Sequence, residues 1–174
     1  MKSEASSASP GQPPAARDAD PFARDPDLRP GVAIKRAEQA LMREKNGALR
    51  ALGLTVPQYT AMLALARFPS SSGAQLARRC LVTPQSMASL LVTLERRGLV
   101  RRTTSTVHAK VFPVQLTEAG AALVAQADLV AVAVERRLAD AFTESELTVL
   151  RSLLARVPAA LGDGAESAES ESDL

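Results

Sequence analysis

The sequence has few of the residues that carry enzyme chemistry or covalent cross-links. Its 174 residues include one cysteine, Cys80, and one histidine, His108. A single cysteine excludes a framework of internal disulfides and fits a reducing compartment. A lone imidazole, with no His/Asp/Glu cluster and no glycine-rich phosphate loop elsewhere, leaves no recognisable metal or nucleotide site. We therefore expect a protein that is not an enzyme and that has no metal and no cofactor.

Long hydrophobic runs and aromatic side chains are also scarce. No stretch approaches the roughly 18 apolar residues that a membrane span needs, and the first residues lack the apolar core of a signal peptide. We expect a cytoplasmic protein without membrane contact. Aromatic residues make up 3% of the chain, so a flat ligand would stack on very few side chains.

Both ends of the chain have the composition of disordered segments. Residues 1–28 are rich in Ser, Ala, Pro and Asp, and residues 162–174 are acidic with no basic residue. Such segments have too little apolar surface to repay the entropy of folding. We expect two disordered tails, most simply solubilising extensions, around one domain at residues 29–161.

Helix start signals recur along that domain. A first helix is predicted at residues 30–52, and the pair Thr55 and Gln58 forms a capping box for a second at 57–68. Ser72 and Gln75 repeat this pattern before a short helix that ends near Cys80. After only two intervening residues, Thr83 as N-cap and Pro84 at the first helical position open a helix that reaches residue 97. Two helices joined by so tight a turn predict a helix-turn-helix.

Beyond Gly98 the spacing of apolar residues changes from a helical period to that of β-strands, and after the hairpin it becomes helical again. Residues 99–103 and 111–116 predict a β-hairpin, or wing, whose second strand is an edge because it contains Pro113. Thr117 then caps a long helix, and Thr143 with Glu146 caps another. Their apolar stripes predict packing across a twofold axis. The stripes are Leu123, Ala127, Val130, Val134, Leu138 and Ala141, then Leu147, Leu150, Leu154, Val157 and Leu161.

The expected fold is therefore mainly α with a small β-hairpin. A winged helix-turn-helix lobe spans about residues 54–117, and helices at about 30–52 and 117–161 form the dimerisation region. The modest formal charge of +2 hides a basic middle and an acidic C-terminal tail. A basic middle around a helix-turn-helix indicates double-stranded DNA as the partner, bound by a homodimer.

Short polar side chains occupy the helix face opposite its apolar residues, where DNA bases would be contacted. The expected base contacts are Thr83, Pro84, Gln85, Ser86, Ser89 and Thr93. Basic residues around this helix are placed to contact the DNA backbone, with those of the hairpin forming the wing. They are Arg78, Arg79, Arg96, Arg97, Arg101, Arg102, His108 and Lys110.

Three runs of the sequence resemble the MarR family of transcriptional regulators. They are LTVPQYTAMLALA from Leu54, AQLARRCLVTPQSMASLLVTLERRGLVRR from Ala74, and LTEAG from Leu116. The resemblance implies a homodimer held by its first and last helices, a winged lobe in each subunit, and binding to a short palindrome. It further implies a repressor that a small aromatic or phenolic effector releases from DNA.

The wing and the recognition helix depart from the pattern of that family. His108 and Lys110 stand where the family wing commonly carries Asp-x-Arg, and a lysine lacks the planar fork of arginine. Ser89 and Thr93 stand where relatives often have a basic residue. The preferred DNA sequence is therefore expected to differ from that of well-known members.

Some questions stay open at this level. An effector pocket would use Tyr59, Met62 or Phe68, together with the first helix. The alternative function is a ligand-independent or non-specific architectural DNA-binding protein. Cys80 is expected to pack in the interior rather than to act as a redox switch.

Overall fold

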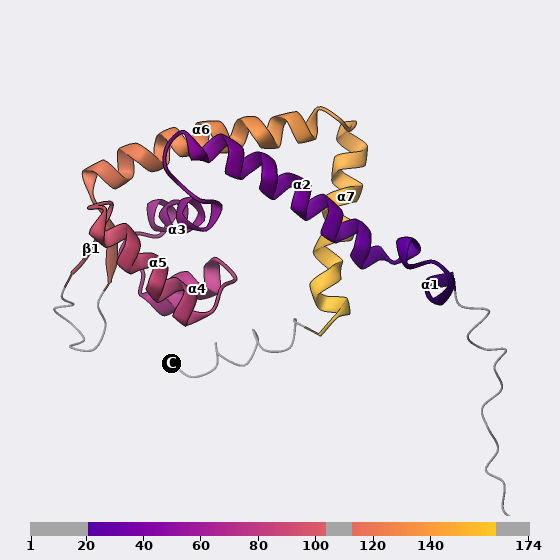
Figure 1. Ribbon diagram of the computed structural model, residues 1–174, viewed down its shortest axis with the longest axis horizontal. Coiled ribbons are helices and arrows are strands. Elements are labelled where there is room, and N and C mark those ends of the chain that lie inside the picture. Colours follow the sequence, from indigo (N-terminus) through magenta and orange to yellow (C-terminus); the bar gives the residue numbers. More distant parts are fainter. Residues whose placement is uncertain (1–20, 104–112, 163–174) are drawn as a thin grey trace, which may run out of the picture. The chain divides into compact units, whose positions relative to one another are not determined.

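The computed structural model describes residues 21–103 and 113–162, and it is mainly helical with one two-stranded hairpin (Figure 1). This confirms the expected fold class. His108, Lys110 and most of the predicted tails lie outside the described residues. Among the described helices, none is long and apolar enough to cross a membrane. The chain divides into two compact units, one that ends at Arg43 and one that begins at Glu44.

The first unit contains a short helix, a 3₁₀ turn and the start of a long helix. These are α1 (Pro21–Arg24), η2 (Pro26–Leu28) and α2 (Pro30–Arg50). The predicted disorder extended to residue 28, whereas the structure gives residues 21–28 these helical turns. A helix start signal at Asp25 and Pro26 was overlooked among the other prolines.

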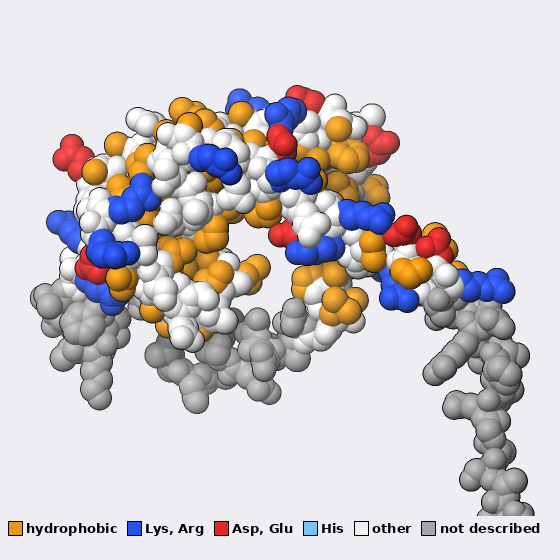
Figure 2. Space-filling model, viewed as in Figure 1, with side chains coloured by type: hydrophobic (Ala, Val, Ile, Leu, Met, Phe, Trp, Pro, Cys, Tyr) orange, Lys and Arg blue, Asp and Glu red, His pale blue; other side chains and the backbone are white. Residues whose placement is uncertain are grey.

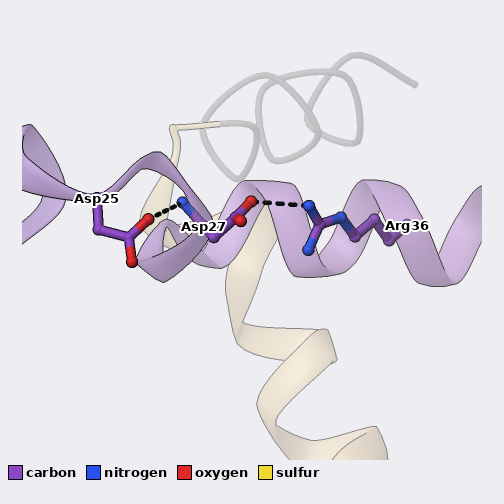
Figure 3. A network of polar contacts seen from close by, with 3 residues as sticks. All are labelled: Asp25, Asp27 and Arg36. Atoms are coloured by element: carbon purple, nitrogen blue, oxygen red, sulfur yellow. Dashed lines mark hydrogen bonds and ion pairs between the residues drawn. The ribbon is translucent and has the colours of Figure 1, made fainter.

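Polar contacts hold these turns together (Figure 3). Asp25 Oδ1 accepts a hydrogen bond from the Asp27 amide at 2.9 Å, and Asp27 Oδ1 pairs with Arg36 Nη2 at 2.7 Å. Arg29 Nε donates to the Phe22 carbonyl at 2.9 Å. Each partner is solvent-exposed, so every one of these contacts contributes little to stability.

The second unit begins with the end of α2 and continues into the helix-turn-helix lobe. The lobe contains α3 (Val56–Arg67), α4 (Gly73–Arg79), α5 (Pro84–Arg96), β1 (Val100–Arg102) and β2 (Val114–Leu116). The predicted capping boxes at Thr55 and Ser72 are present, with Gln58 and Gln75 as their return partners. Because these caps are local, the predicted helix boundaries agree with the structure to within about two residues.

The hairpin is shorter than predicted but has the predicted order. β1 and β2 pair antiparallel, with Val100 opposite Leu116 and Arg102 opposite Val114. On its other side, β2 makes a single bridge, in which the Val114 amide donates to the Ser71 carbonyl at 3.0 Å. The edge-strand prediction from Pro113 therefore holds for that residue but not for Val114, which has a partner on both sides.

Two long helices complete the unit, α6 (Glu118–Ala139) and α7 (Glu144–Ala160). α6 lies tightly against the end of the lobe at Gly120, where a Cβ would stand 2.0 Å from the Leu99 carbonyl oxygen. Thr117 fixes this junction, since its hydroxyl donates to the Gly98 carbonyl and accepts from the Gly120 amide. Ion pairs Lys45–Glu135 and Glu44–Arg137 tie α6 to the end of α2.

The core is formed by the lobe, the end of α2 and the side of α6 that faces the lobe. Its largest fully buried side chains are Leu49, Met62, Leu65, Leu76, Met87, Leu94 and Val114. On α6 the buried residues are Gly120, Val124, Ala127, Ala131 and Val134. Of the stripe predicted to pack across a twofold axis, Ala127 and Val134 are buried in this core, Leu123 and Val130 are half-buried, and Leu138 is exposed. α7 buries no residue at all.

Candidate nucleic-acid interface

The turn between α4 and α5 sets the position of the candidate recognition helix. Leu81 adopts φ of 54°, a left-handed conformation that bulky residues rarely occupy and that stops α4 from continuing. The Val82 amide then donates to the Ala77 carbonyl at 3.0 Å, which closes the turn. Leu81 is also 92% exposed beside the start of α5. Sequence reasoning did not single it out, and its apolar type gave no signal of this exposure.

α5 has the two faces expected of it. Met87, Leu91 and Leu94 are buried, and Leu90 is half-buried. The predicted base-contacting residues lie on the other face, where all are exposed except Thr93, which is half-buried. The structure thus brings the six predicted residues together on one exposed surface.

The hydroxyl groups of Thr83, Ser89 and Thr93 on this surface already donate to acceptors within the helix. Thr83 Oγ1 accepts from the Ser86 amide at 3.1 Å and donates to Ser86 Oγ at 2.8 Å. Ser89 Oγ donates to the Gln85 carbonyl at 3.2 Å, and Thr93 Oγ1 donates to the Ser89 carbonyl at 3.1 Å. Because their hydrogens are engaged within the helix, the Ser89 and Thr93 oxygens are left with acceptor capacity only.

The predicted backbone-contacting arginines fall into two groups. The side chains of Arg78 and Arg96 are exposed and have no hydrogen-bond or ion-pair partner within residues 21–103 and 113–162. Arg79 stacks on the Phe68 ring at 3.8 Å from its centroid and remains exposed. These three lie on α4 and at the end of α5.

The other three arginines have partners within the fold. Arg97 Nη1 donates to the Gly53 carbonyl at 2.9 Å, which fastens the end of α5 to the turn before α3. Arg102 Nε lies 3.4 Å from Glu95 Oε2, and Arg101 Nη2 donates to Gln115 Oε1 at 3.3 Å. Sequence reasoning missed these partners because each pairing joins different elements of the fold.

A cavity of about 570 Å³ opens between α3, β2 and α6. It is lined by Leu63, Leu65, Ala66, Pro69, Gln115, Leu116, Ala121, Val124, Ala125 and Asp128. None of Tyr59, Met62 and Phe68, the residues suggested for an effector pocket, is in this lining. Tyr59 and Met62 are buried in the core, and Phe68 lies beneath Arg79.

Tyr59 nevertheless contacts a residue of the cavity lining, Asp128. Its hydroxyl donates to Asp128 Oδ1 at 2.6 Å. Burial, and then the nearby Asp128 and Glu135 carboxylates, raise the pKa of Tyr59 well above its ordinary value. The phenol is therefore neutral, and it holds the Asp128 carboxylate in place.

Cys80 caps the end of α4 and packs half-buried against the core. Burial raises the pKa of its thiol, which lowers the fraction of reactive thiolate. This environment agrees with a packing role. Within the described residues, no cluster of three or more His, Cys, Asp or Glu side chains is placed to hold a metal ion.

A short helix, a strained turn, a helix with an exposed polar face and a β-hairpin, in that order, define a winged helix-turn-helix fold of the DNA-binding class. The model of the family described as MarR matches residues 52–110. An HTH-type transcriptional repressor of Mycobacterium tuberculosis is 33% identical over 127 residues, which cover 73% of this chain and 91% of the relative. The chain belongs to the MarR family.

Solved structures agree with that assignment. A Mycobacterium tuberculosis MarR family protein in complex with p-aminosalicylic acid is 32% identical, with a TM-score of 0.60, over 75% of this chain and 98% of the other. The transcriptional repressor CouR, bound to a 23-mer DNA duplex, is 26% identical, with a TM-score of 0.71, over 75% of this chain and 93% of the other.

Proposed function

We propose that this protein is a transcriptional repressor that binds a short palindromic DNA site as a homodimer, with α5 in the major groove. The observation that carries the proposal is the exposed, uncharged polar face of α5, bordered by the unpaired Arg78 and Arg96. A solvent-facing helix would usually carry charges on that surface. The relatives named as repressors, and CouR solved on a DNA duplex, support the same function.

The hydrogen-bonding state of α5 favours particular bases. Ser89 and Thr93 present acceptors, and in the major groove the exocyclic amino groups of adenine and cytosine are the donors. Gln85 has both a donor and an acceptor and can pair with the edge of an adenine. We therefore expect Ser89 and Thr93 to contact the amino group of an adenine or a cytosine, and Gln85 an adenine, where α5 enters the groove.

We expect most of the affinity for DNA to come from the arginines around α5. Arg78 and Arg96 would contact phosphates directly, whereas Arg97 serves to hold the lobe together. Arg79 and Arg102 would reach phosphates after their present contacts change, whereas Arg101 would contact a phosphate from the position in which Gln115 holds it. Each neutralised phosphate steepens the fall of affinity with salt.

Exposed apolar residues supply the argument for a homodimer. Leu138, Phe142, Val149, Leu153, Leu154 and Leu161 are each at least 40% exposed at the end of α6 and along α7. Hydrophobic side chains are visible at the surface over α7 (Figure 2). A second copy would cover them, and a twofold dimer would read half-sites about one helical turn, roughly 10 bp, apart.

A small aromatic or phenolic effector is proposed to release the repressor from DNA. The supporting facts are a relative solved with p-aminosalicylic acid and the cavity between the lobe and α6. The alternative, a ligand-independent or non-specific architectural DNA-binding protein, shares the same lobe. The proposed role as a DNA-binding regulator is compatible with the expected cytoplasmic location and with the expectation that the protein is not an enzyme.

Selection of bound duplexes from a random pool tests the proposal. We expect a palindromic consensus whose affinity, in a competition assay at fixed salt, exceeds that of random duplex by at least about a thousandfold. Uniform enrichment of all sequences would support the architectural alternative. Absence of any duplex binding at low salt would overturn the proposal.

A further inference from the structure

The cavity between α3, β2 and α6 has an unusual balance of polar groups. Eight of its ten lining residues are apolar, and the two polar ones are Gln115 and Asp128. Its lining, as far as the structure describes it, includes no lysine or arginine. A carboxylate bound here would therefore meet the charge of Asp128 without a cation from the lining to offset it.

Asp128 is available to a cation. Its Oδ1 atom accepts a hydrogen bond from Tyr59, which is a neutral donor and leaves the negative charge in place. Within the described residues no Lys or Arg nitrogen forms an ion pair with Asp128. Beside apolar walls, such a carboxylate attracts an ammonium group more strongly than it would in bulk water.

Gln115 connects this cavity to the DNA-facing side of the lobe. Its Oε1 atom accepts from Arg101 Nη2 at 3.3 Å, and its Nε2 atom donates to Ser70 Oγ at 2.7 Å. Ser70 has φ of 64°, a left-handed conformation that a serine rarely adopts. A molecule that displaced the Gln115 amide would therefore release both Arg101 and a strained turn.

We propose that this cavity binds a small apolar molecule with a protonated amine, that the ammonium group pairs with Asp128, and that Gln115 couples occupancy of the cavity to Arg101. The first two parts concern binding alone. The coupling rests on the proposed DNA-binding function, which it makes specific. The chemistry of the cavity thus favours an aromatic or aliphatic amine over an aromatic acid, so the effector proposed above would be an amine and would differ in charge from the p-aminosalicylic acid bound by the relative.

Titration calorimetry on the full-length protein at neutral pH tests the binding. The probes are phenethylamine, phenethyl alcohol and phenylacetate, which present an ammonium, a hydroxyl and a carboxylate on a shared phenyl group. We expect phenethylamine to bind about tenfold or more tighter than the alcohol, in line with a charge-assisted hydrogen bond, and phenylacetate to bind weakest.

Two variants assign that preference to Asp128. Asp128→Asn keeps an oxygen that accepts from Tyr59 but removes the charge, so the preference for the amine should disappear. Glu118→Gln removes a charge from the exposed first turn of the same helix and should leave the preference unchanged. Binding of phenylacetate as tight as that of phenethylamine, or a preference that survives Asp128→Asn, would overturn the proposal.

Fluorescence anisotropy on a duplex selected from the random pool tests the coupling. Saturating phenethylamine should lower the DNA affinity of the wild type by several fold. In Gln115→Ala the ligand has no amide to displace, so the calorimetric affinity for the amine should stay the same or rise, while the effect on DNA binding is lost. An equal effect in both proteins, or none in the wild type, would overturn the coupling. If no duplex is bound at all, the proposed function fails, and the calorimetry still decides the nature of the cavity.

Discussion

α5 and α7 have similar sequence patterns but different surroundings. Both begin at a threonine N-cap, Thr83 and Thr143, and both carry leucines at helical spacing. α5 buries three of its apolar side chains within its own chain, whereas α7 buries none. Periodicity therefore predicts that a helix has an apolar face, but it does not say whether the residues that cover this face belong to the same chain or to another.

The largest expected effect comes from the buried face of α5. Leu94 is fully buried, so Leu94→Ala should lower the free energy of unfolding by about 2–5 kcal/mol, because the shorter side chain buries less apolar surface and leaves a cavity behind. Chemical denaturation followed by circular dichroism measures this change. Val92→Ala, at an exposed position of the same helix, is the matched control and should change stability by less than about 0.5 kcal/mol.

The exposed face of α7 should respond in a different way. Leu154→Glu places a charge where a second copy would pack, so we expect the variant to be monomeric in sedimentation equilibrium while its lobe keeps its circular dichroism spectrum. Ser152→Glu adds the same charge at an exposed polar position of α7 as a control. A wild type that is itself monomeric at micromolar concentration would show that α7 has no partner of its own kind.

How far the sequence predicts the structure depends on the range of each interaction. The helix caps at Thr55 and Ser72 involve residues three positions apart, so they were predicted correctly along with the boundaries they set. The side of α6 that packs on the lobe was not predicted, because Gly120 and the alanines lie on it and are only weakly hydrophobic. Local patterns thus determined the elements, and close packing decided their orientation.

The candidate site shows the same division. The polar residues of α5 were predicted because they share one helix face, and the structure keeps them together. The partners of Arg97 and Arg102 were missed, since Gly53 lies 44 positions from Arg97 and nothing in the local pattern marks it. Charge type alone cannot separate an arginine that holds the fold from one that is free to bind phosphate.

This distinction between the two kinds of arginine leads to a further prediction, whose expected effect is of intermediate size. Arg78→Ala should weaken binding to all duplexes alike and lower the salt slope by about one for each phosphate that is no longer neutralised, with unchanged stability. Arg97→Ala should instead lower the free energy of unfolding by about 1 kcal/mol, because the variant cannot form the hydrogen bond to the Gly53 carbonyl. Anisotropy at several salt concentrations and denaturation of both variants measure the contrast. Equal effects of the two changes on the salt slope would place Arg97 at the DNA as well.

The last expected effect, no larger than that of Arg97→Ala, concerns Tyr59, which joins α3 to α6 through Asp128. Its pKa is raised in the folded protein, so folding favours the neutral phenol. The contribution to stability is complete below the pKa of an unfolded tyrosine, near 10. It falls as the pH rises above that value, because the unfolded chain releases a proton that the folded protein retains.

Tyr59→Phe isolates this contribution. At neutral pH the variant should be less stable by about 1 kcal/mol, the usual net value of one hydrogen bond, since the Asp128 carboxylate loses a donor. Above pH of about 10 the wild type should lose stability more steeply than the variant, so that the difference between them shrinks. Unfolding free energies of both proteins across the alkaline range measure it. Parallel pH profiles would mean that the Tyr59 phenol titrates alike in the folded and unfolded chains, and α3 and α6 would then be held together by apolar packing alone.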